Sequence, residues 1–117
     1  MTARSVLTAL AVAAPLAAAG ACASALPHAE PRDTEWARAR WPETGEAALE
    51  DGRARYVQTC AGCHALKLPR DVEPGRWQIA VNEMKREHGV VISLPDERLI
   101  VRYLVTMSTR ERPAPSE

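Results

Sequence analysis

The chain has 117 residues, a length that suits a single domain. Its 15 basic and 15 acidic side chains give a formal net charge of zero, which offers no support for nucleic-acid binding because such proteins usually carry a basic surplus. With no phenylalanine, three tryptophans and two tyrosines, the chain has few large side chains for a core, so either the core is weak or a non-protein group completes it.

Residues 1–21 have the layout of a secretory signal peptide. Arg4 supplies one early positive charge, and an apolar run over residues 6–16 and a group of small residues follow it. Pro15 and the many alanines make the segment too short and too weakly apolar for a stable membrane span. We therefore expect an exported, periplasmic protein.

The end of this segment, Ala-Gly-Ala at residues 19–21 followed by Cys22, resembles the lipobox of bacterial lipoproteins. The alternative is ordinary cleavage one or three residues after Cys22, where small residues also stand at the required positions. Cys60 and Cys63 form a pair and leave Cys22 as an odd thiol, which favours lipidation at Cys22. The sequence thus predicts attachment to a membrane through a lipid on that residue.

Residues 22–45 are rich in proline and charge, and this composition predicts a tether or N-terminal arm. Trp36 and Trp41 are unusual in a linker, and we expect them to pack against the surface of the domain. The folded domain is expected over residues 46–110, with a flexible tail over residues 111–117.

Three helices are predicted within this domain, and no strand pattern is convincing, so the expected fold class is all-α. The first helix, residues 46–59, carries Cys60 at its C-terminal end. The third, residues 93–108, begins at Ser93, whose spacing to Asp96 resembles a capping box. Its apolar face consists of Leu99, Ile100, Tyr103, Leu104 and Met107.

The second helix is predicted over residues 75–88 and carries the clearest apolar stripe in the chain. Gly89 follows it as a stop signal. The stripe has the spacing i, i+3, i+4, i+7 and i+11, which puts its members on one helix face. These members are Trp77, Ala80, Val81, Met84 and His88.

The sequence CAGCH at residues 60–64 is the most specific motif of the chain. Two cysteines at this spacing match the two vinyl groups of a haem, and the histidine that follows supplies a ligand to its iron, so the motif predicts one covalent haem c on Cys60, Cys63 and His64. A zinc site would need two more ligands, for which the chain offers only His28, His88 and carboxylates. A redox dithiol of the thioredoxin kind would need a βαβ context, which the sequence lacks.

The chain resembles small monohaem c-type cytochromes of the secreted or lipoprotein type, with CAGCH as the most specific feature. The supporting motifs are Trp41-Pro42, the run from Tyr56 to His64, the W-x₆-M spacing of Trp77 and Met84, and Tyr103-Leu104. This resemblance implies a compact cytochrome c-like fold, with the first and last helices packed together around one haem. It also implies electron transfer as the role, with no enzymatic activity.

The resemblance makes Met84 the first candidate for the sixth iron ligand. His88, one turn further along the same face, and Met107 are the alternatives, and an open sixth position is a further one. Arg76 and Trp77 are candidate donors to a haem propionate. The backbone carbonyl of Pro69 is a candidate acceptor for the Nδ1–H of His64.

Three functions remain open at this point. The first is an electron carrier whose partners are redox proteins, such as an oxidase, a quinol-oxidising complex or a periplasmic dehydrogenase. The second is a haem-based ligand-binding or sensor protein with an open or weakly capped sixth position. The third, a haem enzyme, would use His88 and Arg86 beside an open iron.

Overall fold

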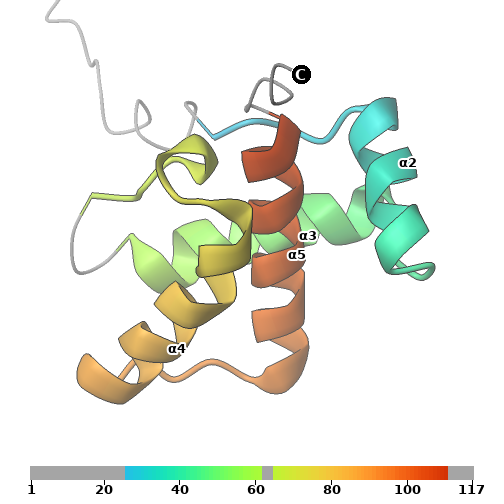
Figure 1. Ribbon diagram of the computed structural model, residues 1–117. Coiled ribbons are helices and arrows are strands. Elements are labelled where there is room, and N and C mark those ends of the chain that lie inside the picture. Colours follow the sequence, from blue (N-terminus) through green and yellow to red (C-terminus); the bar gives the residue numbers. More distant parts are fainter. Residues whose placement is uncertain (1–25, 62–64, 111–117) are drawn as a thin grey trace, which may run out of the picture.

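The computed structural model describes residues 26–61 and 65–110, and these residues form an all-helical, compact unit (Figure 1). The α-helices are α2 (Pro31–Arg40), α3 (Glu46–Cys60), α4 (Trp77–Glu87) and α5 (Leu94–Arg110), and two short 3₁₀ helices are η1 (Pro69–Asp71) and η2 (Pro74–Arg76). No strand occurs in this part of the chain, which confirms the all-α class. The predicted signal peptide, Cys22, Cys63, His64 and the predicted tail over residues 111–117 lie outside the described residues.

Helices α3 and α5 cross closely at the centre of the fold (Figure 1). Gly52 makes this crossing possible, because a Cβ atom at this position would lie 2.8 Å from the Cβ atom of Tyr103 and closer still to the carbonyl oxygen of Leu99. The expected packing of the first predicted helix against the last is therefore confirmed. Glycine weakens a helix, and the close approach of α5 explains why a glycine stands at this position in α3.

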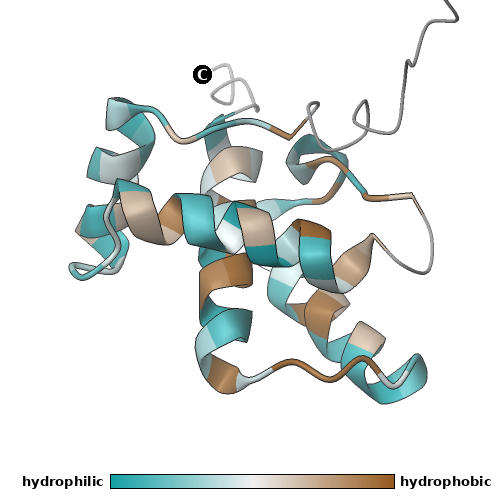
Figure 2. Ribbon diagram, turned by 180° about the vertical axis from the view of Figure 1, so that it is seen from behind, coloured by the Kyte–Doolittle hydropathy of each residue, from teal (hydrophilic) through white to brown (hydrophobic). Residues whose placement is uncertain are grey.

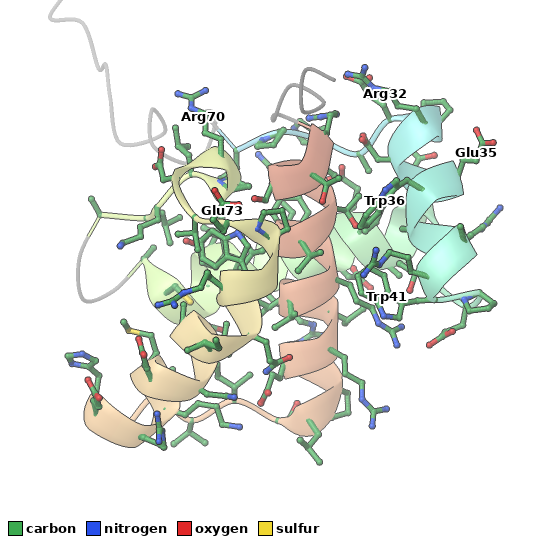
Figure 3. The ribbon with its side chains drawn as sticks, in the orientation of Figure 1. Arg32, Glu35, Trp36, Trp41, Arg70 and Glu73 are labelled. Carbon is green, nitrogen blue, oxygen red and sulfur yellow. The ribbon has the colours of Figure 1, made fainter. Side chains whose placement is uncertain are left out.

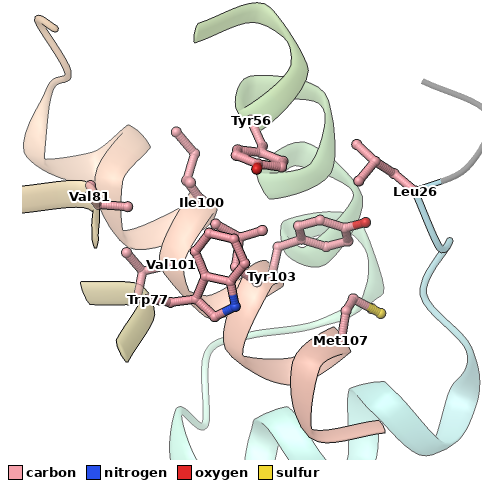
Figure 4. Close-up of a cluster of buried hydrophobic side chains, with 9 residues drawn as sticks. Leu26, Tyr56, Trp77, Val81, Ile100, Val101, Tyr103 and Met107 are labelled. Atoms are coloured by element: carbon pink, nitrogen blue, oxygen red, sulfur yellow. The ribbon is translucent and has the colours of Figure 1, made fainter. Parts of the chain in front are cut away.

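The hydrophobic core is built around α5 (Figure 4). Four of the five residues that the sequence assigned to its apolar face are fully buried, and Leu99 is half-buried. Side chains from α3, α4 and the N-terminal arm complete this core. Its buried members are Leu26, Tyr56, Trp77, Val81, Ile100, Val101, Tyr103, Leu104 and Met107.

The tether predicted over residues 22–45 is wrong for residues 31–40, which form α2, so the expected number of about three helices is also too low. Leu26 is 1% exposed and belongs to the core. Asp33, which is 3% exposed, pairs with Arg110 of α5 at 2.7 Å. Asp33 also accepts the backbone N–H of Glu30 at 2.7 Å, which caps the helix. The packed unit therefore includes the arm from Leu26 onward.

The two tryptophans of the arm lie between α2 and α5 (Figure 3). Trp36 and Trp41 meet edge to face, with ring centroids 6.1 Å apart. The guanidinium of Arg40 lies 5.0 Å from the Trp36 ring, and that of Arg102 of α5 lies 5.4 Å from the Trp41 ring. The Arg40 contact lies within α2, whereas the Arg102 contact joins Trp41 to α5 and helps to hold the arm against the domain, as the sequence predicted for this tryptophan.

Helix α4 begins and ends close to its predicted bounds. The 3₁₀ turn η2 replaces its predicted first residues, and Gly89 ends it with a φ of 65°. The coil that follows is hydrophobic (Figure 2) and leads to Ser93, whose hydroxyl accepts the backbone N–H of Asp96 at 3.3 Å. Within the described residues, none of the helices has the length and apolarity that crossing a membrane requires.

Candidate functional site

A cavity of about 300 Å³ lies between the C-terminal end of α3 and the apolar face of α4. This volume is at the lower end of the range for small-molecule and cofactor sites. Its walls come from α3, from the segment that follows the CAGCH motif, from α4 and from the coil after α4. The lining residues are Tyr56, Thr59, Cys60, Lys67, Val72, Trp77, Ala80, Val81, Glu83, Met84, His88 and Val90.

The wall formed by α4 is the helix face that the sequence predicted. All five members of the apolar stripe, from Trp77 to His88, line the cavity. Trp77 and Val81 are also buried in the core. The same face of α4 therefore contributes to both the core and the cavity wall. This arrangement brings Met84 and His88 to one cavity with Cys60, the first residue of CAGCH.

Two buried aromatic rings form the inner end of the cavity and fix the loop that follows the motif. Tyr56 and Trp77 meet edge to face with centroids 6.1 Å apart. The hydroxyl of Tyr56 donates to the carbonyl of Lys67 at 2.9 Å, and the indole N–H of Trp77 donates to the carbonyl of Pro69 at 3.2 Å. The loop is therefore held by one residue from α3 and one from α4.

A third hydrogen bond holds the loop from α5. The hydroxyl of Ser108, which is fully buried, donates to the carbonyl of Val72 at 2.6 Å. Val72 is itself a cavity residue, so this bond fixes part of the wall. Helices α3, α4 and α5 thus each supply one hydrogen-bond donor to the loop. These bonds fix the loop, so the cavity wall that it forms is held in place although it lies outside the α-helices.

The cavity has an apolar interior and a few polar groups. Burial raises the pKa of Tyr56 well above its ordinary value, so the tyrosine is neutral in the folded protein at ordinary pH. Lys67 and Glu83 bring one positive and one negative side chain to the lining, and His88 brings an imidazole. A largely apolar cavity with few polar groups is typical of a cofactor site.

The predicted site residues divide into three groups. Cys60, Met84 and His88 come together at the cavity, whereas Cys63 and His64 lie outside the described residues. Met107 is 0% exposed in the core and is not among the lining residues, so the structure does not bring this alternative ligand to the site.

The structure brings one of the two candidate propionate donors to the cavity and not the other. Arg76 is exposed and is not among the residues that line the cavity. Trp77 does line the cavity, but its indole N–H donates to the carbonyl of Pro69. The carbonyl of Pro69, a candidate acceptor for the Nδ1–H of His64, thus accepts the N–H of Trp77. A carbonyl oxygen has two lone pairs, so a second donor remains compatible with this bond.

The chemistry of the donor set fits a covalent haem. Cys60, whose thiol would form a thioether bond to a porphyrin, lines the cavity. The thioether of Met84 and the imidazole of His88 are groups that can ligate iron, and both line the cavity from α4 and its C-cap. The apolar side chains between them suit the porphyrin body. His28 pairs with Glu50 at 3.0 Å and is not a lining residue, so it does not join Cys60 as a zinc ligand would.

Several lining residues escaped the sequence analysis. The sequence did not single out Thr59, Lys67, Val72, Glu83 or Val90 as site residues. Thr59 follows from its place next to Cys60, and Glu83 from its place next to Met84. The loop residues could not be placed from the sequence because hydrogen bonds from three different helices determine their position.

Comparisons with protein families, with curated proteins and with solved structures found no match to this chain.

Proposed function

We propose that this protein is a monohaem c-type cytochrome that transfers single electrons through one covalently bound haem. The observation that carries the proposal is the cavity, because Cys60 of CAGCH and Met84 line the same largely apolar space. A motif match alone can arise by chance. Here the first cysteine of the motif lines the same cavity as the apolar face of α4, which was predicted independently of the motif. The cavity is also largely apolar, as cofactor sites usually are.

In this proposal the chain's own residues hold the cofactor and tune it. Cys60 and Cys63 would hold the haem through two thioether bonds, and His64 and Met84 would supply the ligands to its iron. The haem, when bound, supplies an iron that changes between Fe(III) and Fe(II). Tyr56 and Trp77 close the inner end of the cavity and keep water from it, because both rings are buried and both polar atoms have partners.

We also propose that the protein is exported and acts at a membrane, with redox proteins as its partners and no enzymatic activity of its own. The signal peptide layout and Cys22 support export and lipid attachment. Val91 is 93% exposed and adjoins Val90 of the cavity wall. An exposed apolar side chain at this place suits the small, short-lived contacts of electron-transfer proteins.

Haem attachment is tested first with serine variants of Cys60 and Cys22. The protein is expressed with haem-attachment machinery, denatured and examined for haem that stays on the polypeptide. Cys60→Ser should lose one thioether bond and much of the covalent haem, and Cys22→Ser, the matched control, should keep it. Loss of the protein from the membrane fraction in Cys22→Ser alone would support the lipid anchor. Wild-type protein that carries no covalent haem would contradict the proposal.

Axial ligation is tested by absorption spectra of the oxidised and reduced protein. Wild type should give a low-spin c-type spectrum and a far-red sulfur-to-iron band in the oxidised form. Met84→Leu should abolish this band, and Met107→Leu, the same change made in the core, should keep it. A high-spin wild-type protein that binds CO readily would favour the alternative function, a haem-based sensor.

A further inference from the structure

Two side chains that can ligate iron line the same cavity from the same helix. Met84 lies in the third turn of α4, and His88 is the C-cap residue of that helix. Residues four apart on a helix are neighbours, with Cβ atoms about 5–6 Å apart. A cofactor that is ligated by one of them therefore has the other close at hand.

The imidazole of His88 is available for such a role. Within the described residues no hydrogen bond or ion pair engages its ring, although its backbone N–H donates to the carbonyl of Met84 at 3.2 Å. His88 stands where the helix ends and is exposed. The next residue, Gly89, has a φ of 65°. Because a helix end frays more easily than its interior, a small backbone adjustment at this point costs little.

We propose that His88 is a reserve iron ligand: it stays off the iron while Met84 is bound and takes the sixth position when the Met84 sulfur is withdrawn. The inference rests on the proposed function, since it requires the haem. It goes beyond that function because it gives the site two low-spin states in place of one. A thioether ligand raises the reduction potential relative to an imidazole, so the two states would differ in potential.

Lys67 is the rival for the vacant position. It also lines the cavity, and a deprotonated amine can ligate iron. His88 lies one helix turn from Met84 at the end of the same helix, whereas Lys67 belongs to the loop that follows the motif. His88 is therefore the better placed of the two, and a variant without Lys67 separates the two possibilities.

The experiment compares spectra and reduction potentials of the haem-loaded full chain at pH 7. Met84→Ala should lose the far-red sulfur band, remain low-spin and have a lower potential than wild type. Met84→Ala with His88→Ala should become high-spin and bind CO. Met84→Ala with Lys67→Ala should behave like Met84→Ala alone. His88→Ala alone should keep the wild-type sulfur band, because the inference keeps His88 off the iron while Met84 is bound.

Added imidazole provides a second measurement that does not depend on assigning spin states. If His88 occupies the sixth position for nine-tenths of the time, imidazole should bind Met84→Ala about tenfold more weakly than the double variant lacking His88. Far-ultraviolet circular dichroism checks that both proteins keep their helices.

Three results would overturn the inference and leave the proposed function intact. These are a high-spin Met84→Ala protein, a double variant that stays low-spin, and equal imidazole affinity in the two proteins. Loss of the sulfur band in His88→Ala alone would also overturn it, because His88 would then support Met84 rather than replace it. Wild type without covalent haem would instead defeat the proposed function.

Discussion

Gly52 of α3 lies directly against the backbone of Leu99 in α5, so the two central helices approach each other very closely at this point. The neighbouring atoms are the carbonyl group of Leu99 and the Cβ atom of Tyr103, and none of them can rotate away as the end of a long side chain can. The spacing of α3 and α5 is thus set by a residue without a Cβ atom. Both helices also frame the site, since α3 carries Cys60 and α5 carries Ser108, which holds the loop.

The first prediction concerns this contact. Gly52→Ala should lower the free energy of unfolding, because overpacking a tight contact costs about 1–3 kcal/mol. That exceeds the gain of at most about 1 kcal/mol from the better helix propensity of alanine. Chemical denaturation followed by circular dichroism measures the change.

Gly75→Ala is the control for this substitution. A Cβ atom at Gly75 would meet nothing within 4 Å. Its effect should stay within about 0.5 kcal/mol, the usual range for surface changes. Equal stability of Gly52→Ala and wild type would show that the helices separate without cost, and the close crossing would not be a determinant of stability.

The sequence predicted α4 and the cavity wall well because both depend on local periodicity. A stripe of apolar residues at helical spacing determines which face turns inward, and the stripe from Trp77 to His88 does line the cavity. The CAGCH motif singled out Cys60 from the sequence alone, and Cys60 lines the same cavity.

Helix α2 was missed because its signals are weak in the sequence. Among its residues only Asp33 and Ala37 are buried, so it has no apolar stripe. Pro31 suggests a linker, although proline is well suited to the first turn of a helix. What holds α2 is the pairing of Asp33 with Arg110, 77 positions away. Such a contact between distant residues cannot be read from local patterns.

The second prediction concerns this arm. Asp33→Asn should destabilise the protein by about 1.5–3 kcal/mol, because it removes the charge from a buried hydrogen bond to Arg110. Glu35→Gln, an exposed change on the same helix, is the control and should have little effect. Thermal unfolding of both variants measures the difference. If Asp33→Asn matched wild type, the arm would not contribute to the stability of the domain.

The third prediction concerns alkaline pH. The pKa of Tyr56 is raised by burial, so the folded protein holds the phenol proton more tightly than the unfolded chain. The stability from this group is complete below the ordinary tyrosine pKa of 10.0 and is lost as the pH rises above it. Tyr56→Phe should remove this part of the alkaline loss. It should also cost about 1 kcal/mol at neutral pH, because the bond to the Lys67 carbonyl disappears.

Denaturation curves recorded between neutral and strongly alkaline pH test this expectation. Wild type should lose stability above pH 10 more steeply than Tyr56→Phe. Identical slopes in the two proteins would mean that other groups determine the alkaline transition. Tyr103→Phe, which removes a hydroxyl bonded to the Pro27 carbonyl at 2.7 Å, shows what the loss of a hydrogen bond away from the cavity costs at neutral pH.

The fourth prediction concerns stability at acidic pH and the ion pair between Lys85 of α4 and Glu97 of α5. Hydrogen bonding to Lys85 at 2.5 Å lowers the pKa of Glu97 below its ordinary value of 4.5. The folded state therefore favours the carboxylate, so its stabilisation is present above pH 4.5 and is lost as the pH falls. Glu97→Gln should cost about 0.5–1 kcal/mol at neutral pH and nothing at low pH, whereas the exposed control Glu87→Gln should change neither. An equal deficit for Glu97→Gln at pH 7 and at low pH would rule out the ionised carboxylate as its cause.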